Sequence, residues 1–141
     1  MAKRNGRQWL LDLLKEVEGK ISKERLAEIL ESRGRACLPE AMLTKARKAA
    51  KDIKNDAEFL DNLEKVYPML KREGDEVYVV YPECYCPGMK ELVADAPDYY
   101  CACSVGWIKE MFEQALARPV EVRLESSVIR GDAECRLRVM M

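Results

Sequence analysis

The sequence contains no histidine, and this absence excludes several kinds of catalytic site. A Ser-His-Asp triad, a Cys-His dyad and a catalytic metal ion held by imidazole all require that side chain. Long apolar runs are also missing: Asp12 interrupts the WLLDLL stretch, and no run approaches the roughly 18 to 20 residues of a membrane span. No signal peptide is recognisable at the start of the chain. We therefore expect a cytoplasmic protein that is not integral to a membrane.

Aromatic residues are scarce, at 7% of the chain, whereas 48% of the residues are hydrophobic and 35% are charged. This composition is typical of a soluble globular protein, and 141 residues suit one compact unit. The net charge is -1, with basic residues concentrated before residue 55 and acidic residues after it. Because solvated helix faces commonly produce such an asymmetry, nucleic acid is not an expected partner.

The first half of the chain has the apolar periodicity of amphipathic helices. Helices are expected over residues 7–18, from the N-cap Ser22 to a stop at Gly34, from Pro39 to Lys54, and from Asn55 through apolar positions as far as Leu70. Gly74 is expected to close this helical half. The first helix is expected to bury one apolar face, made by Trp9, Leu10, Leu13, Leu14 and Val17.

The second half of the chain has a different character. Residues 76–82, EVYVVYP, predict a strand, and Ser104 is expected to cap a helix over 105–117. Residues 119–125 and 133–141 alternate in polarity around an Arg-Gly-Asp turn, which predicts a β-hairpin rather than an adhesion motif. The predicted fold class is α+β: a helical N-terminal segment (1–74) packed on a cysteine-rich core (75–141) with a small antiparallel sheet and one long helix.

Six cysteines are the most informative feature for function. Two Cys-x-Cys pairs, Cys84 with Cys86 and Cys101 with Cys103, are followed by Cys135 on the last predicted strand. In extended backbone, residues i and i+2 point to the same side, so each pair offers two thiols to one partner. We predict that these five cysteines bind a metal, zinc in preference to an iron-sulfur cluster. Thiol redox chemistry, catalysis and inert buried thiols are the alternatives, and Cys37 has no assigned role.

Three segments between residues 100 and 140, YCACSVGW, ARPVEV and IRGDAECRLRV, resemble the 4-vinyl-reductase-like domain. The matching positions are Cys101, Gly106, Trp107, Pro119, Val120, Gly131, Asp132 and Cys135. The resemblance implies a small-molecule sensor with a zinc site that includes Cys101 and Cys135. The family's other two ligands, a glutamate and a cysteine, would fall on Leu124 and Ser127, while Glu125 lies one residue out of register. The resemblance therefore implies a modified site, in which Cys84, Cys86 and Cys103 replace the missing ligands.

The CYCP and YCACSVGW features, with RGRAC upstream, also resemble short bacterial proteins that are similar to 2-aminothiazoline-4-carboxylate hydrolases. We predict a domain that binds or senses a small molecule, in a pocket between the helix at 105–117 and the sheet. The expected lining residues are Tyr100, Trp107, Met111 and Phe112. One alternative is a metal- or thiol-dependent hydrolase of a small ring compound, and another is a DNA-associated regulator. A homodimer is expected, because a small sheet leaves edges to cover.

Overall fold

The computed structural model describes residues 6–83, 89 and 91–141, and these residues form the α+β fold that the sequence predicts. The helices are α1 (Gly6–Val17), α2 (Lys23–Ala36), α3 (Glu40–Ala49), α4 (Asp56–Val66) and α5 (Ala102–Leu116), with short 3-10 helices η1 (Val93–Asp95) and η2 (Val128–Arg130). The strands are β1 (Leu70–Glu73), β2 (Glu76–Tyr81), β3 (Glu121–Ser126) and β4 (Cys135–Met140). None of the helices in this part of the chain is long and apolar enough to cross a membrane.

The described strands form one antiparallel sheet in the order β1-β2-β4-β3. Because successive side chains point to opposite faces, one face is apolar and buried, and it includes Val79 paired with Leu137. The other face carries charged side chains, such as Arg136, whose guanidinium lies 3.9 Å from the centre of the Tyr78 ring. Tyr81 pairs with Cys135 two residues further along the buried face. This end of the sheet borders the site described below.

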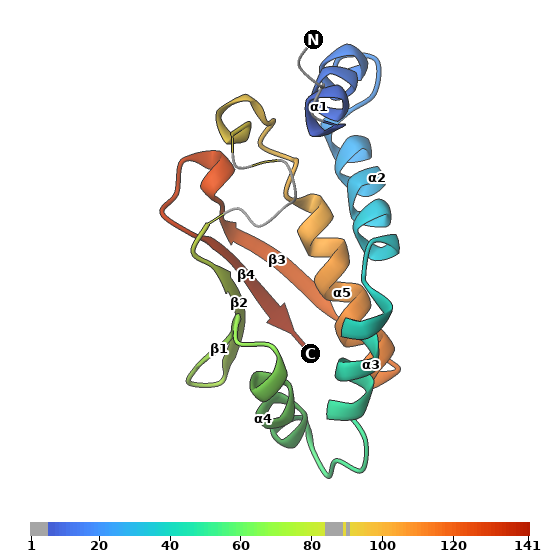
Figure 1. Ribbon diagram of the computed structural model, residues 1–141, viewed down its shortest axis with the longest axis vertical. Coiled ribbons are helices and arrows are strands. Elements are labelled where there is room, and N and C mark those ends of the chain that lie inside the picture. Colours follow the sequence, from blue (N-terminus) through green and yellow to red (C-terminus); the bar gives the residue numbers. More distant parts are fainter. Residues whose placement is uncertain (1–5, 84–88, 90) are drawn as a thin grey trace.

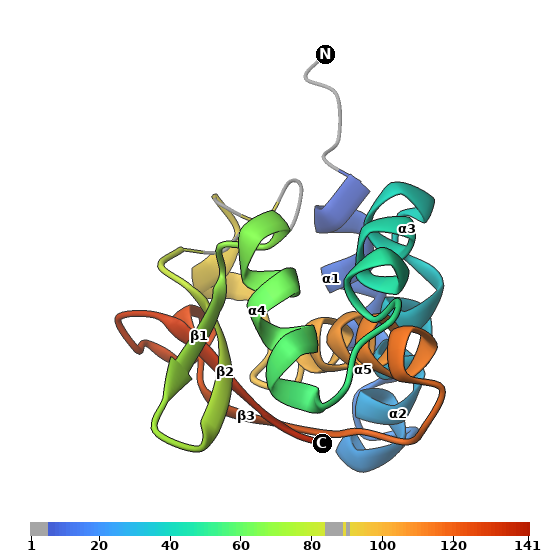
Figure 2. The ribbon, with the colours of Figure 1, turned by 90° about the horizontal axis from the view of Figure 1, so that it is seen from below.

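Helix α5 lies between the sheet and α2, and α4 covers the same face of the sheet as α5 (Figures 1 and 2). The main core joins α3, α4 and α5 to the sheet, and Phe59 meets Phe112 edge to face with ring centroids 5.7 Å apart. A second apolar cluster joins α1 and α2 to Tyr99 and Tyr100, just before α5. Burial of one large apolar side chain stabilises the folded state by roughly 1.5 to 3 kcal/mol. The main core therefore holds α5 against the sheet, and the second cluster holds α1 and α2 against the segment that leads into α5.

Two predicted helix starts are confirmed by their capping bonds. The side chain of Ser22 accepts a hydrogen bond from the backbone N–H of Arg25 at 3.2 Å, at the start of α2. The side chain of Asn55 accepts one from the N–H of Glu58 at 2.9 Å, at the start of α4. These bonds satisfy backbone donors that a helix leaves open at its first turn.

The predicted helix stop at Gly34 is wrong, because α2 continues through Gly34 to Ala36. Gly34 and Gly106 lie where α2 crosses α5. A Cβ atom at Gly34 would lie 1.9 Å from the carbonyl oxygen of Cys103, and one at Gly106 would lie 1.9 Å from that of Glu31. Since the two backbones are in direct contact, the crossing requires glycine from both helices.

The end of the helical half was also predicted wrongly. Helix α3 ends at Ala49 rather than at Lys54. Leu70 belongs to strand β1 rather than to the fourth helix, and Gly74 with Asp75 forms a two-residue hairpin turn between β1 and β2. Leu70, four positions after Val66, fits helical spacing. It adopts an extended conformation instead, because it pairs with Val79 of β2.

Two further details of the helices differ from the prediction. Helix α5 begins at Ala102 rather than after Ser104, because the N–H groups of Ser104 and Val105 both donate to the carbonyl of Cys101. The expected apolar face of α1 is only partly buried: Leu14 is inside, whereas Trp9 is 58% exposed and Leu13 is 40% exposed. Helix α1 therefore buries a narrower face than its sequence offers.

Candidate functional site

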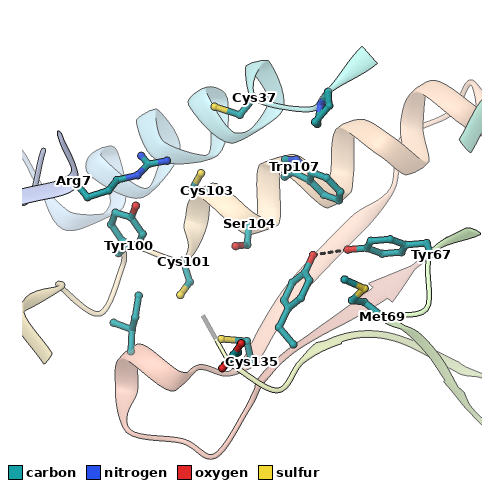
Figure 3. Close-up of a pocket in the computed structure, with 14 residues that line it drawn as sticks. Arg7, Cys37, Tyr67, Met69, Tyr100, Cys101, Cys103, Ser104, Trp107 and Cys135 are labelled. Atoms are coloured by element: carbon teal, nitrogen blue, oxygen red, sulfur yellow. Dashed lines mark hydrogen bonds between the residues drawn. The ribbon is translucent and has the colours of Figure 1, made fainter. Parts of the chain in front are cut away.

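A cavity of about 450 Å³ lies between the first turns of α5 and the end of the sheet (Figure 3). Its wall is formed mainly by apolar and aromatic side chains from α5, β2 and the segments that precede β1 and α5. These include Tyr67, Met69, Tyr81, Tyr100, Trp107 and Ile129. Four of the described cysteines also border it, namely Cys37, Cys101, Cys103 and Cys135. The cavity is large enough for a small ligand, since such sites enclose roughly 300 to 1,000 Å³.

Cys101 and Cys135 meet at one side of this cavity, and their sulfur atoms point toward each other (Figure 3). Cys101 caps α5 and Cys135 is the first residue of β4, so two elements distant in sequence position the pair. Both side chains are buried. The sulfur of Cys135 accepts a hydrogen bond at 3.3 Å from the backbone N–H of Val128, and the Cys101 thiol lies beside it (Figure 3).

These donors lower the pKa of Cys135 to about 6, well below the ordinary value of a cysteine. The hydrogen bond from Cys101 makes the largest contribution; burial opposes it, and the N–H of Val128 and the hydroxyl of Ser127 add to it. Hydrogen bonds to a charged form favour that form. The lowered pKa favours a thiolate on Cys135 near neutral pH, and a thiolate is the nucleophilic and metal-binding state of cysteine.

The turn between β3 and β4 builds the other side of the thiol pair. The N–H of Ser127 donates to the Asp132 carboxylate at 2.8 Å, and the N–H of Asp132 donates to the Ser127 carbonyl at 3.0 Å. Gly131 adopts a φ of +94°, which a residue with a side chain rarely tolerates. The result places the Ser127 hydroxyl 3.1 Å from the Cys101 sulfur and the Val128 N–H against Cys135. The Gly-Asp-x-x-Cys pattern thus corresponds to a turn that presents donors to a thiolate.

A pair of tyrosine hydroxyls also lies on the cavity wall, where Arg7, Glu83 and Ser104 are further polar residues. The hydroxyls of Tyr67 and Tyr81 lie 2.5 Å apart and share a hydrogen bond. Burial raises the pKa of Tyr67, and it raises the pKa of Tyr81 to about 12, with the charge of nearby Cys135 adding to that rise. Both phenols therefore keep their protons at neutral pH.

Cys103 does not share the geometry that the sequence analysis assumed for it. The expectation of two thiols on one side of an extended segment is wrong for Cys101 and Cys103, because Cys101 caps a helix and Cys103 lies in its first turn. Helical residues two apart point to different sides. In Figure 3 the sulfur of Cys103 points away from that of Cys101. The structure therefore pairs Cys101 with Cys135 and places Cys103 elsewhere on the cavity wall.

The predicted metal site depends on residues that the structure does not describe. Cys84 and Cys86 lie outside the described residues, so their role stays a prediction. Among residues 6–83, 89 and 91–141, no three cysteine, aspartate or glutamate side chains gather closely enough to hold a metal ion. Cys101 and Cys135 are two suitable sulfur ligands, whereas tetrahedral zinc requires four ligands. Zinc or an iron-sulfur cluster here would need ligands beyond this part of the chain.

The four residues predicted to bind a ligand separate into two groups. Tyr100 and Trp107 line the cavity. Met111 and Phe112 are completely buried in the main core and are not among the described residues that line the cavity. The cavity lies at the N-terminal end of α5, whereas Met111 and Phe112 lie two to three turns along the helix. The pocket is thus nearer to Cys101 than the helical periodicity indicated.

Sequence reasoning missed the two tyrosines, Tyr67 and Tyr81, that form the hydroxyl pair. Tyr81 shares the strand alternation of Val77 and Val79, so its place on the buried face could have been read from the sequence. Tyr67 follows a helix end and meets Tyr81 only through the tertiary fold. Ser127, which the resemblance singled out as a ligand position, lies against Cys101.

Comparison with curated proteins finds no match to this chain. The sequence profile of a family described as a family of unknown function, DUF6144, matches residues 1–141. This match spans every element described above, from α1 to β4, and the chain therefore belongs to this family.

Proposed function

We propose that this protein binds or senses a small, largely apolar molecule in the cavity beside Cys101 and Cys135. The observation that carries the proposal is the combination of a cavity of about 450 Å³ with two convergent polar groups, the thiol pair and the tyrosine pair. Ligand sites generally combine an apolar lining with a few polar groups that orient the ligand. The same combination is unexpected for a packed core, which leaves few voids larger than a water molecule.

Trp107 and Tyr100 support this proposal, because they border empty volume while the nearby core is tightly filled. Met111 and Phe112 already occupy the space between α5 and the sheet. The aromatic side chains at the start of α5 therefore border the cavity in addition to packing against the two apolar clusters. Large aromatic faces contribute strongly to the binding of apolar ligands.

A thiol-dependent hydrolase is the second candidate, and the lowered pKa of Cys135 favours it. A thiolate at neutral pH can attack an electrophilic carbon in a small ring, as nucleophilic catalysis requires. A zinc ion on Cys101 and Cys135, as in the sensor domains that the sequence resembles, stays a prediction. The binding proposal holds for either chemistry, because both require a small molecule beside the thiol pair.

The test is a thermal-shift screen of small aromatic and sulfur-containing acids and ketones. A ligand at 100 times its dissociation constant stabilises the folded state by about 2.7 kcal/mol, a shift of several degrees in Tm. The variant Ser104→Leu places bulk on the cavity wall and should abolish the shift. The matched variant Ser32→Leu, on the exposed surface of α2, should keep it. If no compound raises the Tm of the native chain, the proposal fails.

A further inference from the structure

We propose that the cavity takes an α,β-unsaturated carbonyl compound with an apolar substituent, and that Cys135 captures this compound by conjugate addition. This inference rests on the proposed binding function and specifies the ligand class. Its basis is the placement of a hydrogen-bonded cysteine sulfur and a pair of tyrosine hydroxyls on the wall of one apolar cavity.

The sulfur of Cys135 is placed as a nucleophile within the cavity. Cys135 borders the empty volume, and its sulfur accepts a hydrogen bond from the Val128 N–H at 3.3 Å. The Cys101 sulfur points toward it (Figure 3). Cys101 is a positioning residue here, while Cys135 is the residue that would form the bond.

The tyrosine pair lies within reach of the same ligand. Tyr81 and Cys135 are direct cross-strand partners on the buried face of the sheet, an arrangement that places Cβ atoms about 4.5 to 5.5 Å apart. The hydroxyls of Tyr67 and Tyr81 bond to each other, and a phenol O–H can rotate toward a new acceptor. An oxygen atom of a ligand in contact with Cys135 can therefore accept a hydrogen bond from this pair.

Conjugate addition of a thiol uses both the Cys135 sulfur and the tyrosine pair, and it requires no other reactant. The Cys135 sulfur forms a bond to the β-carbon, the carbon-carbon π pair moves toward the carbonyl, and negative charge develops on the carbonyl oxygen. A hydrogen bond from the tyrosine pair stabilises that charge. The α-carbon then takes up a proton, which replaces the proton released when the Cys135 thiol ionised. The net reaction joins one thiol to one double bond, and nothing leaves.

The choice of an unsaturated carbonyl follows from the position of the hydroxyls. A disulfide or an alkyl halide would react with the sulfur but would give the tyrosine pair nothing to stabilise. The apolar wall, with Trp107 and Met69, favours a substituent such as a phenyl ring. A ligand with an electrophilic carbon, a carbonyl oxygen and an apolar group therefore matches Cys135, the tyrosine pair and the apolar part of the cavity wall. The wall also includes the charged residues Arg7 and Glu83.

The experiment compares two ketones of nearly equal shape, the enone 4-phenylbut-3-en-2-one and its saturated analogue 4-phenylbutan-2-one. Intact-mass spectrometry with peptide mapping follows adduct formation, and thermal shift follows binding of the saturated ketone. We expect one enone adduct per chain, on Cys135, and none in the variant Cys135→Ser. Tyr81→Phe should slow the addition at least about tenfold. Tyr99→Phe, a tyrosine outside the cavity wall, should leave the rate unchanged.

The two ketones separate the failure of this inference from the failure of the proposed function. If the saturated ketone stabilises the protein but the enone leaves Cys135 unmodified, the covalent step is wrong and binding stands. Equal labelling of other cysteines in Cys135→Ser would also overturn it. If neither ketone binds or reacts, both proposals fail for this ligand class. A stoichiometric zinc ion on Cys101 and Cys135 would block the sulfur and contradict the inference as well.

Discussion

The two sides of helix α5 differ in how closely they pack against the neighbouring segments. On the side that faces α2, Gly34 and Gly106 bring two backbones into contact, so no side chain or ligand can enter. On the side that faces the end of the sheet, the first turns of α5 border a cavity of about 450 Å³. The closed side fixes the helix, and the open side presents Cys101 and Trp107 to the cavity.

This difference shows how a small protein can keep an open site. A cavity costs free energy, because the atoms around it lose packing contacts. Here the crossing with α2 and the main core, which contains Phe112, hold α5 against that loss. Ion pairs between Arg35 and Glu113 and between Lys109 and Glu31 join the same two helices. The closed side should therefore determine the stability of the fold, and the open side should determine the reactivity of the candidate site.

The largest effect is expected from filling the closed side. Gly106→Ala and Gly34→Ala each place a Cβ atom against a backbone carbonyl that cannot move independently. We expect each to lower the free energy of unfolding by about 3 kcal/mol or more. Urea denaturation measures the change, with Gly6→Ala as the control, because nothing lies within 4 Å of a Cβ atom there. A change below about 1 kcal/mol at Gly106 would show that the helices separate easily, contrary to the account.

On the open side, the reactivity of Cys135 should depend on pH with a midpoint of about 6. The thiolate is the reactive form, so the rate of alkylation by iodoacetamide should rise through pH 6 and level off near neutrality. An ordinary cysteine continues to gain reactivity up to about pH 8.5. In Cys101→Ala the main donor is lost, and the midpoint should move upward. Peptide mass spectrometry isolates Cys135 from the other thiols, and an unchanged midpoint in Cys101→Ala would refute the assigned cause.

The turn that supports the thiol pair should have a smaller effect on stability. Asp132→Ala removes the carboxylate that accepts from the Ser127 N–H. We expect a loss of about 1 kcal/mol, the usual net value of one such hydrogen bond. Asp98→Ala, an exposed aspartate before α5, should change the stability by less than about 0.5 kcal/mol. Equal effects of the two substitutions in thermal unfolding would show that the turn does not depend on Asp132.

The smallest expected effect concerns Tyr99, whose buried hydroxyl has no hydrogen-bond partner among the residues that the structure describes. An unsatisfied buried hydroxyl destabilises the folded state. Tyr99→Phe should therefore leave the stability unchanged or raise it by a few tenths of a kcal/mol. Chemical denaturation measures this change. A loss above about 1 kcal/mol would mean that the hydroxyl has a partner after all.

The sequence predicted the fold class because most of the helices and strands have strong local signals. The capping residues Ser22 and Asn55 mark two helix starts, and the alternation in EVYVVYP marks β2. Gly34 was misread because a glycine near the end of a helix normally stops it. Gly34 is required because α2 packs closely against α5 at this point. That contact belongs to the tertiary structure and has no signal in the local sequence.

The candidate site was predicted less completely, for a related reason. The resemblance joined Cys101 and Cys135, which lie 34 residues apart in the sequence and meet where α5 and β4 begin. The spacing of Cys101 and Cys103 was interpreted as extended, although the start of α5 determines their directions. The tyrosine pair joins the end of α4 to β2 and has no local signal. A site that is built from contacts between distant parts of the sequence can be identified only in the folded structure.

The two tryptophans allow the most direct test of the central claim, that a small molecule binds on the open side of α5. Trp107 lines the cavity, whereas Trp9 is 58% exposed on α1 and is not among the described residues that line it. Their indole N–H groups give separate signals in a ¹H-¹⁵N correlation spectrum, which can be followed during titration with 4-phenylbutan-2-one. We predict that the Trp107 signal shifts and saturates while the Trp9 signal stays in place. A spectrum in which neither signal moves, or in which both move together without saturation, would contradict the account.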